Sequence, residues 1–424
     1  MSILIKDATA ITREGKAKKC DVLIEGNTIS RASPGINASA EHKINASGKL
    51  LLPGFANTHA HTAMSLLRGY ADDMELHKWL KERIWPVEKK MNAQSVHAGA
   101  MLGICEMIKS GTTSFSDMYF QMDSVAKAVS DSGMRSMLGY GMVDLGDEGK
   151  REKELKEGER FAREWNGKEE GRISTCIAPH SPITCSSELL QSSAQIANKL
   201  NCKIHLHLSE TREELFQIMQ KTNKRPVDYL DSLGFLSPRV LAAHCVWISA
   251  QEAVLLGKKG VSISHCPVSN MKLAGGGAAP LPELMGAGCT ISLGTDGAAS
   301  NNSLSMFEEM KSCSLLQKHA RWDAEVIKAQ EAFAFATKGG AKALGINAGE
   351  ITPGKLADLI LLDAKAVNLQ PAHNLISNIV YSAHAGNVMD VIIDGKLIMQ
   401  ERKILSFDEE KVIEKAENEA EKIC

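Results

Sequence analysis

LLPGFANTHAH, residues 51–61, joins a short apolar run to two histidines that stand one residue apart. Side chains at positions i and i+2 of a β-strand point to the same side of the strand. His59 and His61 therefore point into one space, and this spacing suits two ligands of a metal ion. A single histidine is more often structural or exposed, so the pair needs support from the rest of the chain.

Eight short apolar runs, separated by helical stretches, follow one another through the middle of the chain. This alternation is typical of a parallel α/β architecture, and eight repeats over about 300 residues predict a (β/α)8 TIM barrel. The predicted barrel strands are residues 51–55, 113–115, 136–140, 174–178, 203–208, 240–243, 261–264 and 290–293.

The two ends of the chain share another pattern, in which short β-type runs alternate with tight turns. Near the start these runs are residues 2–5, 21–24 and 27–29, and near the end they are residues 358–362 and 391–396. We therefore predict a small β-sandwich domain built from residues 1–50 and 355–424, beside a barrel domain over residues 51–354. Apolar Val412, Ile413 and Ala416 predict an amphipathic helix over residues 408–422.

Composition excludes several classes of protein. The 49 Lys and Arg residues nearly balance the 51 Asp and Glu residues, and a net charge of -2 disfavours binding to nucleic acids or anionic membranes. The sequence has no apolar stretch of about 20 residues and no signal peptide, so we expect a cytoplasmic protein. The 10 cysteines include no Cys-x-x-Cys pair, which predicts reduced thiols rather than disulfides or a thiolate zinc cluster.

Polar residues follow most of the predicted strands, at the ends that meet on one face of a barrel. His180 follows the fourth run, the fifth contains His205 and His207 and is followed by Glu210, and His244, His265 and Asp296 follow the last three. Several imidazoles with one carboxylate predict a divalent metal site, usually zinc and sometimes iron or manganese. His97, His319, His373 and His384 stand outside this pattern and receive no role.

Four motifs at strand ends combine into a familiar pattern: residues 53–61 (PGFANTHAH), 207–210 (HLSE), 265–270 (HCPVSN) and 294–297 (GTDG). Together they resemble the amidohydrolase superfamily over essentially the whole chain. Residues 64–69 (MSLLRG) and 84–88 (IWPVE) are most similar to 5-methylthioadenosine/S-adenosylhomocysteine deaminases and the related 5'-deoxyadenosine deaminases. The resemblance implies the barrel and the small β domain described above.

The resemblance also implies roles for individual residues. It makes His59, His61, His207 and Asp296 the ligands of one divalent metal ion, zinc or iron, because no lysine follows the second to fourth strands to hold another. Such an ion supplies hydroxide at neutral pH. Glu210 is implied as the proton shuttle, although by itself it could be a solvated acid in the first turn of a helix. Asp296 is implied as a proton acceptor, and His244 as the residue that stabilises the developing charge.

Substrate contacts follow from the same resemblance. Glu88 matches the acid that accepts hydrogen bonds from two ribose hydroxyls, and His180 matches a residue that contacts the nucleoside, beside Glu210 and Asp296. An arginine after the third strand is expected to reach the 5' substituent, and Arg151 is the candidate. From the residues alone, Glu88 could be a surface charge and Arg151 a solvated helix arginine.

The implied activity is hydrolytic deamination of adenosine analogues: 5'-deoxyadenosine, 5'-methylthioadenosine, S-adenosylhomocysteine or adenosine, in S-adenosylmethionine recycling. The alternative is deamination or dechlorination of guanine, cytosine or a triazine, for which the ribose-binding role of Glu88 would have no purpose. A non-catalytic metal-binding scaffold is disfavoured because no ligand or shuttle is missing. A nucleic-acid deaminase is disfavoured because its zinc signature is absent. The resemblance further implies a homo-oligomer, a tetramer.

Overall fold

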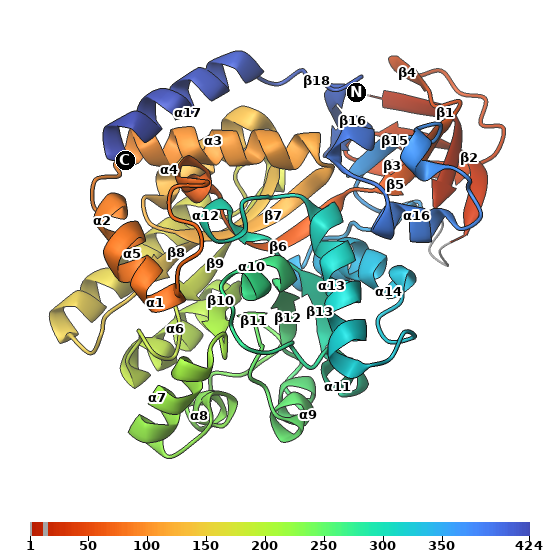
Figure 1. The fold of residues 1–424 in the computed structure, drawn as a ribbon. Coiled ribbons are helices and arrows are strands. Elements are labelled where there is room, and N and C mark those ends of the chain that lie inside the picture. The colour runs from red at the N-terminus through yellow and green to blue at the C-terminus, as the bar shows by residue number, and fades with distance from the viewer. Residues whose placement is uncertain (1, 12–15) are drawn as a thin grey trace.

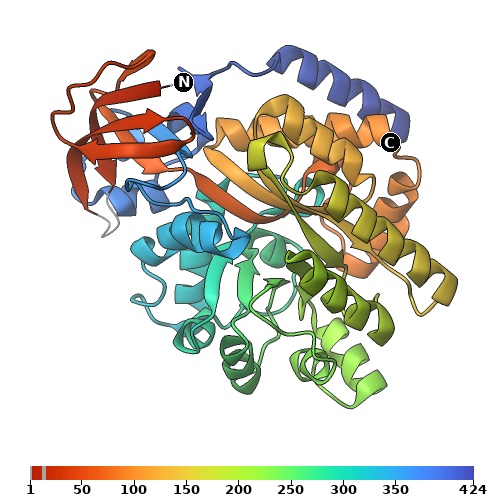
Figure 2. The same ribbon diagram turned by 180° about the vertical axis from the view of Figure 1, so that it is seen from behind.

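Parallel strands close into a barrel in the middle of the computed structural model, which describes residues 2–11 and 16–424 (Figures 1 and 2). Within the described residues, nine strands form this sheet in the order β13-β12-β11-β10-β9-β8-β7-β6-β14. The short β14 continues the path of β13 and pairs with β6, which closes the ring. This arrangement confirms the predicted (β/α)8 barrel. The strands are β6 (Phe55–His61), β7 (Thr112–Tyr119), β8 (Arg135–Met142), β9 (Ile173–Pro179), β10 (Lys203–Leu208), β11 (Val240–His244), β12 (Ser262–His265), β13 (Thr290–Leu293) and β14 (Asp296–Gly297).

The first predicted barrel strand, residues 51–55, is wrong in its position. Its apolar residues belong to β5 (Lys49–Pro53), which pairs with β15 (Leu359–Asp363) in the other sheet, and the barrel strand begins only at Phe55. Gly54 separates the two strands, and a Cβ atom there would lie 2.1 Å from Thr113 Oγ1. Only glycine fits this close approach. The shift places both His59 and His61 within β6 itself.

The second sheet is built from both ends of the chain, as predicted. Its strands follow the order β18-β17-β16-β15-β5-β1-β2-β3, with β4 beside β1. The turn between β2 and β3 lies beside the turn between β16 and β17, where Asn27 Nδ2 donates to Asp394 Oδ1 at 3.2 Å. Apolar side chains of β1, β2 and β15 form a separate core here. The remaining strands are β1 (Ser2–Ile11), β2 (Ala17–Glu25), β3 (Thr28–Ser33), β4 (His42–Asn45), β16 (Val388–Ile393), β17 (Lys396–Gln400) and β18 (Lys403–Ile404).

Helices surround the barrel and cover its outer face (Figure 2). Their starts carry the expected signals: Asn92 caps α3, and Ser249 with Glu252 forms a capping box at α9. The outer helices are α3 (Ala93–Lys109), α4 (Met122–Ser132), α5 (Glu148–Trp165), α6 (Ser187–Leu200), α7 (Arg212–Thr222), α8 (Pro226–Ser232), α9 (Ala250–Lys258), α11 (Leu281–Gly286), α13 (Met306–Arg321), α14 (Ala329–Ala334), α15 (Gly340–Leu344) and α16 (Leu375–Tyr381). Shorter helical segments follow single strands: η1 (Thr62–Leu67), α1 (Leu76–Trp79), η2 (Leu80–Ile84), α2 (Trp85–Glu88), α10 (Pro267–Lys272) and α12 (Ala298–Asn301).

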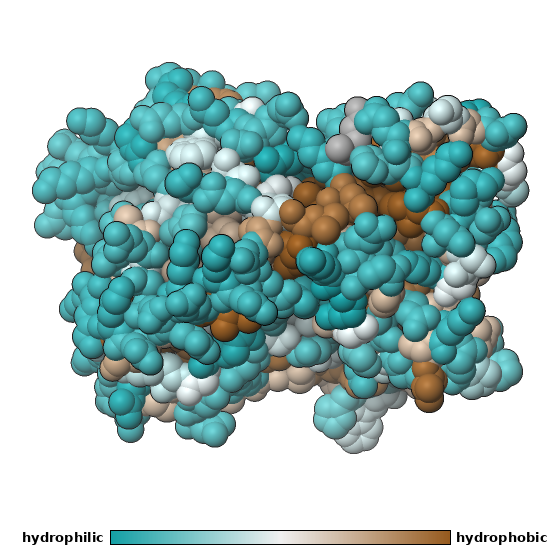
Figure 3. Space-filling view, turned by 90° about the horizontal axis from the view of Figure 1, so that it is seen from above, coloured by the Kyte–Doolittle hydropathy of each residue, from teal (hydrophilic) through white to brown (hydrophobic). Residues whose placement is uncertain are grey.

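The last helix, α17 (Glu409–Ile423), confirms the predicted amphipathic segment and lies beside α3 (Figure 1). It buries Val412 and Ala416, whereas Ile413 is exposed, contrary to its predicted place on the apolar face. The face seen from above in Figure 3 is mostly hydrophilic, with one larger hydrophobic area near its middle. Among the described residues, no helix combines the length and the apolar character that a membrane crossing requires.

A buried ion cluster joins the barrel to the small domain. Arg135, the first residue of β8, donates from Nε to Asp358 Oδ2 at 2.7 Å and from Nη2 to Asp394 Oδ1 at 2.7 Å. All three side chains are almost fully buried. Although burial opposes charge, contacts with the two carboxylates raise the pKa of the guanidinium above its ordinary value. The arginine therefore stays charged and forms ion pairs with two buried carboxylates.

Arg135→Ala should lower the free energy of unfolding by about 3–5 kcal/mol, because it leaves two buried carboxylates without their cation. Urea unfolding followed by circular dichroism measures the loss. Arg163→Ala is the matched control, because Arg163 pairs with Glu159 at the surface of α5 and exposed pairs contribute little. Equal losses in the two variants would contradict the prediction.

Candidate metal centre

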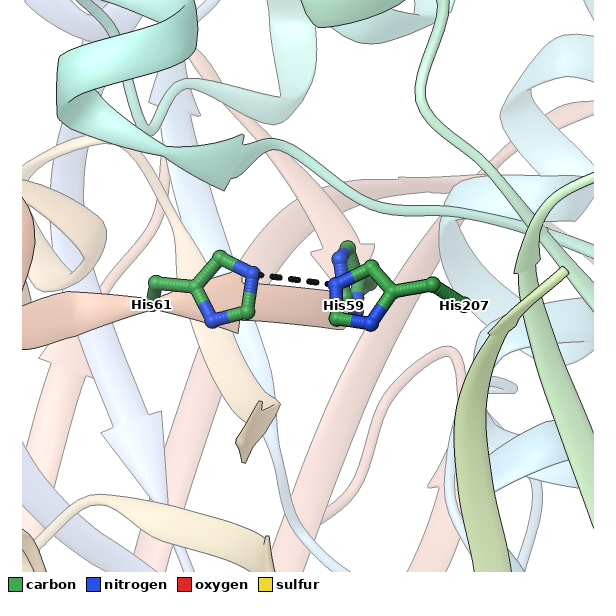
Figure 4. A group of neighbouring side chains, drawn as sticks. All are labelled: His59, His61 and His207. Atoms are coloured by element: carbon green, nitrogen blue, oxygen red, sulfur yellow. Dashed lines mark hydrogen bonds between the residues drawn. The ribbon is translucent and has the colours of Figure 1, made fainter. Parts of the chain in front are cut away.

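Three imidazoles at the carboxyl end of the barrel turn their Nε2 atoms toward one point (Figure 4). His61 Nδ1 lies 2.6 Å from the carbonyl oxygen of Met118, and His207 Nδ1 lies 2.8 Å from that of His180. A carbonyl only accepts, so both Nδ1 atoms carry a proton, and each ring in its neutral form presents its Nε2 lone pair to the site. His59 Nδ1 contacts a side chain instead, His205 Nε2 at 2.9 Å.

The distances between these atoms suit a bound cation. Nε2 of His61 and Nε2 of His207 lie 3.4 Å apart, and Asp296 Oδ1 lies 3.2 Å from His61 Nε2 and 3.4 Å from His59 Nε2. Ligands held at about 2.0–2.1 Å around a tetrahedral zinc ion lie about 3.3–3.4 Å from one another. Two lone pairs this close repel each other unless a cation separates them. The four predicted ligands therefore fit one divalent metal ion.

Two serine hydroxyls hold the carboxylate of Asp296. Ser269 Oγ and Ser300 Oγ donate to Asp296 Oδ2 at 2.6 and 2.8 Å, which leaves Oδ1 facing the histidines. Burial opposes ionisation, but the contacts with His59 and His61 keep the pKa of Asp296 well below its ordinary value. Burial opposes the charge of His61, but Asp296 raises the pKa of that imidazole to about 9, so a bound cation would take the place of its proton. One carboxylate and three imidazole nitrogens are a donor set that zinc and iron accept.

The backbone is bent where the site residues leave their strands. His244 at φ 69° and Asp296 at φ 62° adopt the left-handed region, which residues other than glycine rarely occupy. Such conformations persist where the surrounding structure enforces them, and they cluster at functional sites. Gly294 allows the necessary close packing, because a Cβ atom there would lie 2.7 Å from His59 Cβ.

Glu210 and His244 stand next to each other at the ends of β10 and β11. Glu210 Oε2 lies 3.9 Å from His244 Nε2, and His244 Nδ1 lies 3.2 Å from Asn270 Oδ1. The buried carboxylate of Glu214 accepts hydrogen bonds from the backbone N–H groups of Ser209 and Glu210, both at 2.9 Å. Burial raises the pKa of Glu214 to about 7. Glu214 therefore fixes the turn that carries Glu210.

The structure also brings two predicted substrate residues to this end of the barrel. His180 packs against His207 with ring centroids 4.6 Å apart, and burial together with nearby imidazoles lowers its pKa to about 4. Glu88, in α2, accepts a hydrogen bond from the Tyr119 hydroxyl at 2.7 Å, and the Tyr119 ring lies 6.3 Å from that of His61. Burial raises the pKa of Glu88 above its ordinary value. Glu88 is a half-buried residue rather than an exposed charge.

Arg151 lies in α5 and contacts other residues. Its guanidinium is 3.8 Å from Asp144 Oδ2 and 3.6 Å from Glu148 Oε1, and its side chain is 18% exposed. These acids already neutralise its charge. The structure therefore supports the metal ligands and the surroundings of Glu210 more directly than it supports Arg151.

Several supporting residues had no signal in the sequence. The sequence marks His205 only as the neighbour of His207, and it indicates no role for Tyr119, Glu214, Ser269 or Ser300. His205, Tyr119 and Ser269 act through contacts between segments far apart in the chain, which no spacing reveals. Glu214 and Ser300 each lie four residues after their partners Glu210 and Asp296, but this spacing is common in surface helices.

Comparison with known proteins agrees with this geometry. Residues 50–398 match the model of the amidohydrolase family. The chain belongs to this family. A 5'-deoxyadenosine deaminase of Methanosarcina mazei is 45% identical, covering 99% of this chain and 98% of that protein. A protein of the same name in Methanocaldococcus jannaschii is 47% identical over 94% of this chain and 96% of that protein. A 5-methylthioadenosine/S-adenosylhomocysteine deaminase of Pelotomaculum thermopropionicum is 45% identical, covering 99% of this chain and 98% of that protein.

Solved structures share the fold of this amidohydrolase. An adenosine deaminase from Xanthomonas campestris with bound zinc superimposes with a TM-score of 0.94 at 32% identity, covering 99% of this chain and 98% of that chain. An atrazine chlorohydrolase from Arthrobacter aurescens complexed with zinc gives a TM-score of 0.93 at 21% identity, covering 99% of this chain and 100% of that chain. The second likeness concerns the fold alone. Together with the buried histidines, these findings establish an amidohydrolase with a site for a divalent metal.

Proposed function

We propose that this amidohydrolase is a metal-dependent deaminase that replaces the 6-amino group of adenosine analogues by oxygen and releases ammonia. The observation that carries the proposal is the convergence of three imidazole Nε2 atoms and Asp296 Oδ1, with Glu210 and His244 beside them. The names of the relatives, at about 45% identity over nearly the whole chain, support adenosine analogues as the substrates.

The proposed deamination gives each residue of the site a defined role. His59, His61, His207 and Asp296 would hold a divalent cation, which would lower the pKa of water toward about 7 and so supply hydroxide at neutral pH. Asp296 accepts the proton that this water loses. Glu210 hands a proton to the ring nitrogen beside the attacked carbon, and His244 stabilises the charge that develops there. Asp296 then passes its proton to the amine, which leaves as ammonia, and the new hydroxyl group gives its proton back to Glu210 as the ring carbon keeps the oxygen.

Glu88 distinguishes an adenosine analogue from a free base or a triazine. A carboxylate offers two acceptor oxygens, which suits the neighbouring hydroxyls of a ribose. Tyr119 occupies one position on Glu88 Oε1 and so orients the carboxylate. His180, packed beside His207, would contact the nucleoside. Arg151 remains the candidate for contact with the 5' substituent, which requires its guanidinium to leave Asp144 and Glu148.

Glu88→Gln should lower kcat/KM for 5'-deoxyadenosine by about 10- to 100-fold, because it weakens hydrogen bonds between a charged acceptor and the ribose hydroxyls. The same variant should change kcat/KM for 2',3'-dideoxyadenosine much less, since that analogue lacks both hydroxyls. Steady-state kinetics with the two substrates measure the difference. Glu82→Gln is the control, because Glu82 is an exposed acid in the preceding helical turn. Equal losses on both substrates would contradict the role of Glu88.

The function itself is tested by ammonia release and loss of the adenine ultraviolet band. Purified protein loaded with metal is given 5'-deoxyadenosine, methylthioadenosine, adenosylhomocysteine, adenosine and guanine. Turnover of the ribosylated adenines without guanine supports the proposal. Turnover of guanine alone would overturn it in favour of guanine deamination, and turnover of none of these compounds would overturn it in favour of a triazine or cytosine as substrate.

The remaining parts of the proposal concern the metal and the assembly. Zinc is the proposed ion, because the distances fit a tetrahedral site, and iron is the alternative. Elemental analysis of protein expressed without added metal distinguishes them. A homotetramer, cytoplasmic location and a role in S-adenosylmethionine recycling follow from the resemblance to the deaminases, and sedimentation equilibrium tests the first.

A further inference from the structure

His59 differs from the other two histidine ligands in how it is held. His61 and His207 donate from Nδ1 to backbone carbonyl oxygens, whereas His59 Nδ1 meets another imidazole, His205 Nε2, at 2.9 Å. His205 in turn contacts Ser116 Oγ through Nδ1 at 2.9 Å. His59, His205 and Ser116 are all fully buried, and they come from β6, β10 and β7. We call these three residues the inner chain.

The direction of the hydrogen bonds in the inner chain follows from the metal site. His59 Nε2 has no hydrogen-bond partner within the described residues and faces Asp296 Oδ1 at 3.4 Å, so it must carry a lone pair to bind a cation. A neutral imidazole has one proton, which therefore lies on Nδ1 and is donated to His205 Nε2. His205 then carries its own proton on Nδ1 and donates it to Ser116 Oγ.

We propose that His205 is a positioning residue that fixes the tautomer and the orientation of His59 and thereby sets the affinity of the metal site. Removal of its Nε2 acceptor leaves the buried N–H of His59 without a partner. The other tautomer of His59 would then place a proton on Nε2, where it blocks the cation. A partner that orients a metal-binding histidine in this way typically contributes 10- to 100-fold to metal affinity. The inference rests on the proposed metal site and not on the substrate.

The position of His205 explains why a side chain is needed here. β6 and β10 are not neighbours in the barrel sheet, so the backbone of β10 does not pair with β6. His205 lies two residues before His207 on the same face of β10, one level deeper in the barrel. An imidazole has the length to reach His59 from this strand and two ring nitrogens to serve two partners. The side chain of His205 therefore links the metal ligand His59 to Ser116 of β7.

The test compares two substitutions of His205 that differ in one property. His205→Gln offers Oε1 as an acceptor near the former Nε2 atom, whereas His205→Leu fills similar space without an acceptor. The dissociation constant for Zn²⁺ is measured by competition with a chromophoric chelator, in the absence of any nucleoside. We expect a 10- to 100-fold increase for His205→Leu and an increase of less than about threefold for His205→Gln.

A matched control distinguishes the loss of the residue that positions His59 from the loss of any buried imidazole. His265, at the end of β12, is equally buried, and neither of its ring nitrogens has a hydrogen-bond partner within the described residues. His265→Gln should leave the dissociation constant for Zn²⁺ unchanged. Ser116→Ala, which shortens the inner chain at its far end, should raise that constant by about 2- to 10-fold.

Two outcomes would overturn the proposal. Wild-type Zn²⁺ affinity in folded His205→Leu would show that His59 needs no partner, and equal weakening in His205→Leu and His205→Gln would show that shape rather than the acceptor matters. If His205→Leu fails to fold, Ser116→Ala and His205→Gln decide, since wild-type affinity in Ser116→Ala would refute the inner chain. Zn²⁺ binding by the wild type without deamination of any nucleoside would refute the proposed function and leave this inference intact.

Discussion

Glu210→Gln should keep its metal and lose about 10²- to 10⁴-fold in kcat with adenosine analogues, the range that a general acid or base contributes. Glutamine preserves the size of the side chain and its hydrogen bonds, but it cannot deliver a proton to the ring nitrogen. The metal should remain because Glu210 is not among the atoms that converge on the cation, whose nearest acid is Asp296. Single-turnover kinetics together with elemental analysis of the same sample measure both effects.

The control for this variant is Glu213→Gln. Glu213 lies three residues further along in α7, is exposed, and accepts a hydrogen bond from Gln217. It should retain wild-type kcat. Activity of Glu210→Gln equal to that of Glu213→Gln would contradict the proton-shuttle role, and loss of the metal from Glu210→Gln would instead make Glu210 part of the metal site.

The sequence predicts the metal ligands well because each of them stands in a recognisable motif at the end of a barrel strand. The i to i+2 spacing of His59 and His61 fixes their common direction, and the parallel strands deliver His207 and Asp296 to the same face. The boundary between β5 and β6 at Gly54 is harder to predict, because an apolar run such as residues 51–55 fits either sheet. The pairing of β5 with β15 and of β6 with β7 shows that the chain changes sheets at Gly54.

The support of the ligands could not be predicted from the sequence. His205 reaches His59 across the barrel interior, and Ser269 reaches Asp296 from α10. Such contacts depend on how strands and turns are placed in three dimensions, not on spacing along the chain. Tyr119 likewise meets Glu88 only because the segment after β6 folds back over the end of β7. Sequence motifs therefore predict the metal ligands, whereas most of the residues that hold these ligands in position can be identified only from the structure.

Asp296→Asn should abolish stabilisation by metal while leaving the metal-free protein folded. Asparagine keeps a carbonyl oxygen that can accept from Ser269 and Ser300, and its amide can donate to the lone pairs of His59 and His61. It removes the only negative charge among the four ligands. For the wild type, zinc at 1,000 times its dissociation constant should add about 4.1 kcal/mol to the free energy of unfolding. The variant should gain far less at the same zinc concentration.

Thermal unfolding with and without zinc measures this difference, and wild-type protein treated with a chelator supplies the reference for the metal-free state. The metal-free Tm of Asp296→Asn should lie close to that of the metal-free wild type, because the histidines and serines keep their partners. Activity should fall together with the zinc-dependent rise in Tm, since Asp296 both binds the ion and accepts a proton. A zinc-dependent rise in Tm equal to that of the wild type would show that the three histidines alone hold the metal, and Asp296 would then be left with the proton-accepting role only.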